Sequence, residues 1–170
     1  MISKCFSKTI RFYRIHANAM ILSSKARGAQ PEERKMPIIN ISITGKPDAK
    51  LSAAIAKDIT EITAKELRKD PTITAVAVNY IDPQHWFAGG KSLVDHGTNT
   101  FWLDVKVVDG TNTKLELEAY LKAIFEAFGR LLGGVHEESY AFVHEVPAAA
   151  YGYGGKTQEF RFISGRLKAA

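Results

Sequence analysis

The sequence contains two similar halves, and this internal repeat limits the possible folds more than any other feature. The pair Lys50-Leu51 recurs 64 positions later as Lys114-Leu115, and the run Gly90-Lys91-Ser92 recurs 65 positions later as Gly155-Lys156-Thr157. A repeat of this length is typical of a duplicated supersecondary unit. Each half also has the order strand, helix, strand, so the sequence predicts an α/β (α+β) fold built from two βαβ units.

The first predicted unit covers residues 37–95. Between Pro37 and Thr44, isoleucines alternate with polar residues, which is the period-two signal of a strand. We expect Asp48 to cap a helix that ends before Asp70-Pro71. Residues 73–81 are expected to form the second strand. Because this strand is apolar on both of its faces, it is predicted to be buried on both sides.

The second predicted unit covers residues 96–170, with strands at about 101–108 and 139–146. The helix between them is expected at about 113–132, where Thr113 and Glu116 have the spacing of a capping box. Parallel strands within each unit would put both helices on one face of a four-stranded sheet. Two helices cannot cover the other face, so we expect another copy of the chain to cover it in a homo-oligomer.

The basic charge of the chain is concentrated in residues 1–36. This segment holds eight lysines and arginines but only two acids, for a net charge of +6. The rest of the chain, residues 37–170, is called the body here. It holds 15 basic and 16 acidic residues, for a net charge of −1. We therefore expect no nucleic-acid surface on the body.

Residues 1–36 have the composition of a segment without a folded core, and we expect a disordered or removed extension. Three interpretations stay open: sequence upstream of a true start at Met36, a cleaved targeting segment, or a retained arm. The segment is rich in Ser, Lys and Arg and has no acid before Glu32, which resembles an organellar transit peptide. We expect a cytoplasmic protein, or a mitochondrial one if the segment is a transit peptide. No apolar run approaches the ~20 residues needed to span a membrane, so we expect no membrane association.

The sequence predicts no cofactor and no metal. The two glycine-lysine runs lack the first glycine of a phosphate-binding loop, because His85 and Ala150 occupy that position. We expect the paired glycines to form tight hairpins that do not lead into a helix. The histidines of the body lack the spacing of metal ligands, and the only cysteine, Cys5, lies in the extension.

Pro37 is a structural residue or a catalytic one, depending on whether it is the first residue of the chain. An internal proline has no N–H and no basic lone pair, so it only fixes the backbone at the start of a strand. A terminal proline is a secondary amine. Because alpha-amino groups titrate near ~8 and burial disfavours their charged form, such an amine suits a general base.

Four features together resemble the tautomerase superfamily of the 4-oxalocrotonate tautomerase type. They are Met36-Pro37 at the head of a βαβ unit, the turn Gly45-Lys46-Pro47-Asp48, the run Trp86-Phe87-Ala88-Gly89-Gly90, and a degenerate second copy. Fused two-unit members look closest, among them the cis-3-chloroacrylic acid dehalogenase-like group. The resemblance covers Pro37 to about Phe162. It implies an amino-terminal proline that moves a proton in keto-enol acids or activates water in dehalogenases, and a homotrimer.

The resemblance also implies the roles of individual residues. Pro37 would act as base and then acid, and Lys46 stands where the family has an arginine that holds a substrate carboxylate. Lysine attracts a carboxylate but lacks the two-pronged geometry of arginine. Trp86 matches the aromatic wall of the site and Phe87 would help to enclose an apolar group. Donors to a developing oxyanion are expected from His85 or Asn79.

Several family positions carry other residues here. The arginine of the second strand is replaced by Ala77 and, in the second unit, by Tyr140, and the dehalogenase residues are replaced by Val108, Thr111 and Tyr153. The sequence therefore predicts a proline-based isomerase that acts on a small keto or enol acid. A non-enzymatic oligomeric binding module of the same fold, and a hydratase or dehalogenase of the same family, stay as alternatives.

Overall fold

The first unit folds as the alternation of its apolar residues predicts. The structure is a computed structural model that describes residues 37–169, and in it β1 (Ile38–Thr44) is followed by α1 (Ala49–Leu67) and β2 (Ala75–Ile81). Asp48 caps α1, as predicted, because its carboxylate accepts a hydrogen bond from the backbone N–H of Lys50 at 2.8 Å.

The second unit repeats this order with β5 (Phe101–Val108), α3 (Lys114–Leu131) and β6 (Tyr140–Val146). The predicted capping box is present. The Thr113 N–H donates to Glu116 Oε2 at 2.8 Å, and the Glu116 N–H donates to Thr113 Oγ1 at 3.3 Å. These reciprocal bonds satisfy two backbone donors that the first turn of a helix leaves unpaired, which explains why α3 begins at this point.

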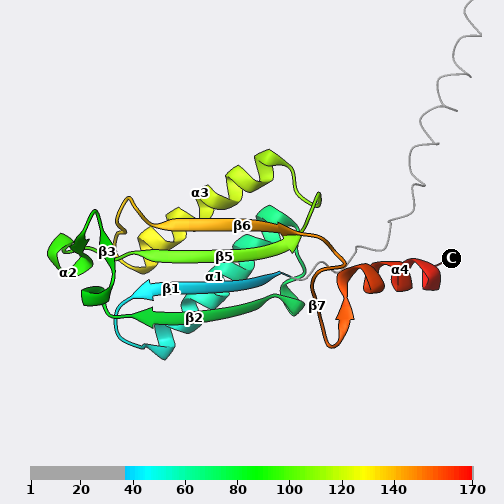
Figure 1. The fold of residues 1–170 in the computed structure, drawn as a ribbon, viewed down its shortest axis with the longest axis horizontal. Coiled ribbons are helices and arrows are strands. Elements are labelled where there is room, and N and C mark those ends of the chain that lie inside the picture. Colours follow the sequence, from blue (N-terminus) through cyan, green and yellow to red (C-terminus); the bar gives the residue numbers. More distant parts are fainter. Residues whose placement is uncertain (1–36, 170) are drawn as a thin grey trace, which may run out of the picture. The chain divides into compact units, whose positions relative to one another are not determined.

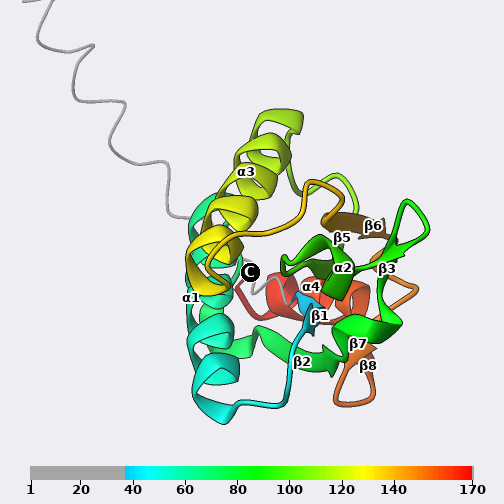
Figure 2. The same cartoon turned by 90° about the vertical axis from the view of Figure 1, so that its left-hand side faces the viewer.

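The four long strands form one sheet in the order β2-β1-β5-β6. Strands are parallel within each unit, and the two units join through the antiparallel pair of β1 and β5. In Figures 1 and 2, α1 and α3 lie together on one face of this sheet. The predicted fold is therefore confirmed. The antiparallel join also means that the start of β1 lies beside the end of β5.

The hydrophobic core fills the space between the sheet and the two helices. Its fully buried side chains come from alternate positions of the central strands and from one stripe of each helix: Ile39, Ile41, Ile43, Phe101, Leu103, Val105 and Val107 from the strands, and Ile55, Ile59, Leu67, Tyr120, Ile124 and Phe128 from the helices. The apolar positions that recur every second residue in the strands, and those that recur at helical spacing in the helices, therefore all face the same core.

Tyr120 is a fully buried tyrosine of the core, and it makes the stability of the domain sensitive to alkaline pH. Burial raises the pKa of Tyr120 to about 12, against a smaller opposing effect of its hydrogen bond with Thr63 at 3.3 Å. An unfolded tyrosine titrates near ~10, so unfolding releases a proton above that pH. The contribution of Tyr120 is therefore complete below about pH 10 and falls by about 3 kcal/mol as the pH rises to about 12.

We expect the Tyr120→Phe variant to lose less stability between pH 10 and pH 12 than the unchanged protein does. The measurement is urea unfolding at a series of pH values. Tyr140→Phe, which changes a tyrosine that is 46% exposed, is the matched control and should retain the full alkaline loss. An equal loss in all three proteins would contradict the assignment to Tyr120.

Both paired-glycine runs form hairpins, as predicted. The first joins β3 (Phe87–Ala88) to β4 (Lys91–Ser92), and the second joins β7 (Gly152–Tyr153) to β8 (Lys156–Thr157). The two turn residues of the first hairpin, Gly89 and Gly90, have φ values of +56° and +79°. Tight hairpins require this left-handed backbone at both turn positions, and glycine adopts it without strain.

The expectation that these hairpins lead into no helix was wrong. The first hairpin runs directly into α2 (Leu93–His96), and the second runs into α4 (Gln158–Ala169). In each helix a side-chain hydroxyl group accepts a hydrogen bond from a backbone N–H of the first turn. Ser92 Oγ accepts from the Asp95 N–H at 3.2 Å, and Thr157 Oγ1 accepts from the Phe160 N–H at 3.1 Å. Both residues therefore act as caps.

The expectations for β2 also need correction. Residues 71–73 form a short 3-10 helix, η1 (Pro71–Ile73), so the strand begins at Ala75 and not at residue 73. In the described chain β2 is not buried on both sides, because Ala75, Ala77 and Asn79 are exposed on the face away from the helices. The reason is topological: β2 is an edge strand, and α1 and α3 cover only one face of the sheet.

Candidate active site at the start of strand β1

Pro37 lies at the end of the sheet where β1 begins and where β5 and β6 end. We call this end of the strands the Pro37 edge, as distinct from the edge strands β2 and β6. The residue is buried, and its carbonyl accepts a hydrogen bond from the Ala75 N–H at 3.3 Å. The neighbouring Ile38 pairs with Lys106 near the end of β5, and Val108 on β5 pairs with Val146 at the end of β6. The segment that follows β6 therefore leaves the sheet at the Pro37 edge.

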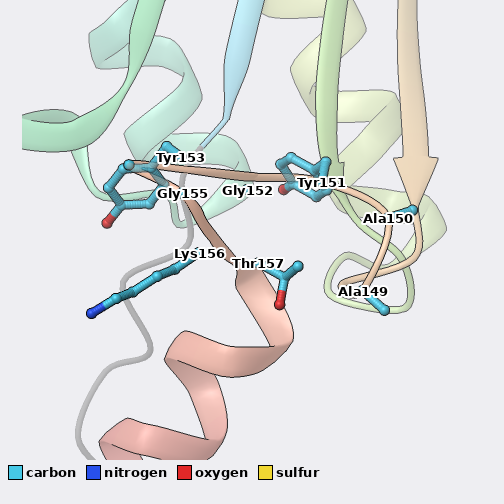
Figure 3. Close-up of a pocket in the computed structure, with 9 residues that line it drawn as sticks. Ala149, Ala150, Tyr151, Gly152, Tyr153, Gly155, Lys156 and Thr157 are labelled. Atoms are coloured by element: carbon cyan, nitrogen blue, oxygen red, sulfur yellow. The ribbon is translucent and has the colours of Figure 1, made fainter.

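That segment is the β7–β8 hairpin of the second unit, which borders a surface cavity of about 440 Å³. The cavity is lined by the continuous stretch from Ala149 to Thr157, which includes Tyr151, Tyr153 and Lys156. In Figure 3 the light-blue start of β1 comes down to the hairpin near Tyr153, and Figure 1 also shows the hairpin beside the start of β1. The cavity, two tyrosines and Pro37 thus share one edge of the sheet.

Arg161 on α4 holds the hairpin in place at this edge. Its Nη2 atom donates a hydrogen bond to the Tyr153 carbonyl at 2.8 Å, and its guanidinium lies over the Tyr153 ring, 3.7 Å from the ring centroid. Such stacking is favourable because the ring face is electron-rich. Arg161 and Lys156 therefore give the Pro37 edge two positive charges.

Tyr151 lies half-buried between the hairpin and the start of α4. Burial raises the pKa of Tyr151 to about 12, and a hydrogen bond with the Gln158 side chain opposes this shift. At neutral pH its hydroxyl group is therefore protonated and remains a hydrogen-bond donor. A protonated tyrosine at this edge is suited to donate to a carbonyl or enolate oxygen.

The other predicted site residues lie at the opposite edge of the sheet. The Gly45 N–H, next to Lys46, donates to the Ile81 carbonyl at the end of β2 at 3.0 Å. His85 ends η2 (Pro83–His85) just beyond β2, and Trp86 and Phe87 follow it. The structure thus brings Lys46, His85, Trp86 and Phe87 to one edge, where Phe87 is 60% exposed.

The length of β1 separates these four residues from Pro37. Seven residues of strand, at about 3.3 Å each, span roughly 20 Å. Asn79 lies between the two edges on β2, opposite Ser42, and its amide donates to the Ile41 carbonyl at 3.3 Å. Within one chain, Pro37 and Lys46 therefore cannot bind the same small molecule. The roles of Lys46, His85, Trp86, Phe87 and Asn79 stay predictions.

The described residues show neither a metal site nor a membrane span. No group of three or more His, Cys, Asp or Glu side chains between residues 37 and 169 is arranged to hold a metal ion. None of the helices in this part of the chain is long and apolar enough to cross a membrane.

Comparison with known families adds a match that begins at Pro37. Residues 37–96 match the family model of the tautomerase enzymes, and this range coincides with the first βαβ unit and its hairpin. The four-stranded sheet of two βαβ units agrees with that match. The described domain therefore has the tautomerase fold, and its first unit matches the tautomerase family model.

Solved structures share the fold of the whole tautomerase domain at low sequence identity. A fused 4-OT that forms a symmetric trimer is 14% identical with a TM-score of 0.64, over 72% of this chain and 97% of that one. The MIF-like protein of Entamoeba histolytica is 17% identical with a TM-score of 0.59, over 71% and 97%. Pt0534, solved after inactivation by 2-oxo-3-pentynoate, is 16% identical with a TM-score of 0.63, over 72% and 97%. No curated protein matches the chain.

Sequence reasoning missed the part that the second unit plays at the Pro37 edge of the tautomerase domain. It gave Tyr151 and Arg161 no role, and it named Tyr153 only as a position where a dehalogenase residue is replaced. The internal repeat contained the signal that points to Tyr151. An offset of 65 residues maps Trp86, the predicted aromatic wall, onto Tyr151, and an antiparallel join of the units puts that tyrosine at the start of β1.

Proposed function

We propose that the tautomerase domain, when its chain begins at Pro37, moves a proton between carbon and oxygen in a small keto-enol acid. The observation that carries this proposal is that the family match begins at residue 37 and that this residue is a proline at the head of β1. The cavity and the two tyrosines at the same edge support it. A small molecule at this edge would lie against the second unit of the same chain.

The chemistry follows from the amine that a terminal Pro37 would carry. Its lone pair removes a proton from the enol oxygen of the substrate, and the resulting ammonium group returns that proton to the neighbouring carbon. The same steps in reverse order give the reverse reaction. The proton that leaves the oxygen is the one that reaches the carbon, so the reaction needs no cofactor. Burial disfavours the charged form of an amine, which would favour the free lone pair that the first step needs.

Substrate binding at the Pro37 edge would draw on the second unit. Lys156 and Arg161 attract the substrate carboxylate, and Tyr151 donates to the oxygen where negative charge develops. We propose that Lys46, Trp86, Phe87 and His85 contribute only if another copy of the chain carries them to this edge. The proposed enzyme is accordingly a homo-oligomer, and the trimeric state of a similar fused 4-OT supports a homotrimer.

Covalent labelling with 2-oxo-3-pentynoate tests the proposed role of Pro37. We expect the protein that starts at Pro37 to gain the mass of one reagent molecule on its first peptide, because the free amine is its reactive nucleophile. The matched control is the full chain, in which Pro37 is an amide and should stay unlabelled. Labelling of a lysine in place of Pro37, or no labelling in the shortened protein, would contradict the proposal.

A binding module without catalysis is the second candidate, and one observation favours it. As long as residues 1–36 are attached, the Pro37 nitrogen is an amide and has no basic lone pair. The cavity and the cations would then bind a small acid without converting it. A dehalogenase is not proposed, because Val108 and Thr111 replace the paired arginines that the resemblance implies for that activity.

A further inference from the structure

The helix α4 presents a row of exposed apolar side chains. Phe160, Ile163 and Leu167 have the spacing of one helix face, and they are 51%, 50% and 75% exposed. We call these three residues the α4 stripe. Figure 1 shows that α4 continues beyond the ends of the strands, away from the hydrophobic core. Exposed apolar patches of this kind mark surfaces that bind a protein or a membrane.

Basic residues surround the α4 stripe, although the rest of the body is acidic. Residues 156–170 hold four basic residues and one acid, for a net charge of +3, whereas residues 37–155 hold 11 basic and 15 acidic residues, for a net charge of −4. Lys156 Nζ lies 5.3 Å from the centroid of the Phe160 ring, and the Arg166 guanidinium lies 5.5 Å from that of Phe162. A negatively charged surface would therefore attract the α4 end of the domain and repel the remainder.

The opposite side of α4 is attached to the β7–β8 hairpin. Gln158 is 6% exposed, and Arg161 stacks on the Tyr153 ring and donates to the Tyr153 carbonyl. A partner can thus reach the α4 stripe but cannot surround the helix. A groove of the kind that binds amphipathic helices has walls on both sides of the bound helix, whereas a membrane surface contacts one face only. The geometry therefore favours a flat partner over a groove.

A membrane surface with negatively charged lipids suits both the apolar and the basic side chains of α4. The apolar side chains of an interfacial helix enter the boundary between head groups and acyl chains, while its lysines and arginines stay among the head groups. The expectation of no membrane association from the sequence considered only segments long enough to cross a membrane. A helix that lies in the membrane surface needs no such length.

We propose that the α4 stripe binds the surface of a membrane that contains anionic lipids, with Arg166 and Lys168 near the head-group phosphates. The helix lies in the surface and does not cross the membrane. Because β8 leads directly into α4, the hairpin that borders the cavity at the Pro37 edge lies close to the membrane in this arrangement. This surface binding is separate from the proposed catalysis, so it does not depend on whether Pro37 is an amine.

Co-sedimentation with vesicles of phosphatidylcholine and phosphatidylserine tests the proposal. We expect the chain that begins at Pro37 to bind these vesicles, and Leu167→Glu to bind them at least about tenfold more weakly, because a charge replaces a buried apolar side chain. Leu115→Glu is the matched control and should bind as the unchanged protein does, because Leu115 is 77% exposed on α3, a different helix.

The contribution of charge is measured with the double variant Arg166→Gln and Lys168→Gln. Each basic residue near an anionic surface strengthens binding about fivefold, so the double variant should bind the mixed vesicles about 25-fold more weakly. The unchanged protein should also bind vesicles of pure phosphatidylcholine more weakly than the mixed vesicles. Equal binding to the two kinds of vesicle would contradict the proposed role of the anionic lipids.

Fluorescence separates insertion of α4 from attraction by charge alone. The full chain is included in this measurement, because its basic residues 1–36 would attract anionic vesicles by themselves. Leu167→Trp places a reporter on the α4 stripe, and lipids with brominated acyl chains should quench its emission in the full and the shortened chain. Leu115→Trp is the control for the two native tryptophans and should be quenched no more than the unchanged protein.

Four outcomes would overturn the proposal. They are a folded protein that binds no vesicle, equal binding by Leu167→Glu and Leu115→Glu, a Leu167→Trp emission that brominated lipids leave unchanged, and a particle mass without vesicles that Leu167→Glu lowers. The last would show that another copy of the chain covers the α4 stripe. Ile163→Glu repeats the binding test in case Leu167→Glu does not fold, which circular dichroism will show.

Discussion

A chain that begins at Pro37 is expected to convert the enol form of phenylpyruvate to its keto form at least about 100-fold faster than the chain that retains residues 1–36. The two proteins would share the same described fold and differ at the Pro37 nitrogen, which is an amine in one and an amide in the other. A positioned general acid-base group contributes about 10²- to 10⁴-fold to a reaction rate. The measurement is the disappearance of enol absorbance in the presence of each purified protein.

Two variants of the shortened protein isolate the role of the proline. Pro37→Ala should lose most of the activity, because it replaces the secondary amine with a primary one and changes the backbone at the head of β1. Pro71→Ala, which changes an exposed proline at the start of η1, should leave the rate unchanged. If the long and the short chain were equally active, or Pro37→Ala kept the full rate, the base would have to be another group.

The largest expected effect on stability comes from Phe128 in the core. Its ring is fully buried and stacks on Phe101, with the centroids 4.1 Å apart and the planes 13° from parallel. Replacing a buried phenylalanine by alanine removes apolar contact area and leaves a cavity, at a cost of about 3–5 kcal/mol. We therefore expect Phe128→Ala to lower the free energy of unfolding by this amount.

Urea unfolding at one fixed protein concentration measures this loss, because self-association would make stability depend on concentration. Leu115→Ala is the matched control on the same helix. Its side chain is 77% exposed, so the change should be within about 0.5 kcal/mol. A loss below about 1 kcal/mol for Phe128→Ala would mean that the helices pack on the sheet more loosely than the structure shows.

Most of the fold could be predicted because each element carries its own local signal. In β1 the buried residues Ile39, Ile41 and Ile43 alternate with outward-facing polar residues. Thr113 and Glu116 have the spacing that predicts the start of α3. The paired glycines predict their hairpins because few other residues adopt a left-handed backbone at two successive positions. Each of these signals lies within about ten residues of the element that it specifies.

The helix α4 was missed and the burial of β2 was wrongly predicted because other features of their sequences were misleading. In α4, Phe160, Ile163 and Leu167 recur at helical spacing, but all three are at least half exposed, so no buried stripe marks the helix. The strand β2 contains valines and alanines on alternate faces. This sequence suits a strand buried on both sides, and only the strand order shows that it is at the edge.

The candidate site was harder to predict than the fold because it depends on which residues lie at the same edge of the sheet. Lys46 and Trp86 belong to the same unit as Pro37, and the family resemblance implied that they act with it. The register of β1 with β5 puts the second unit at that edge, and no local pattern encodes this register. Tyr151 and Arg161 therefore became visible only in the folded chain.

The duplication described above also sets a limit on the number of amine centres that a chain can hold. The 64-residue offset maps Pro37 onto Phe101, which is internal, fully buried and engaged with Phe128. A continuous chain has one amino terminus, so the second unit can never present a terminal amine of its own. Two separate units would bring two termini, whereas the fused chain brings one. In the proposed function, the second copy would therefore form part of the wall around the single amine that the first copy begins.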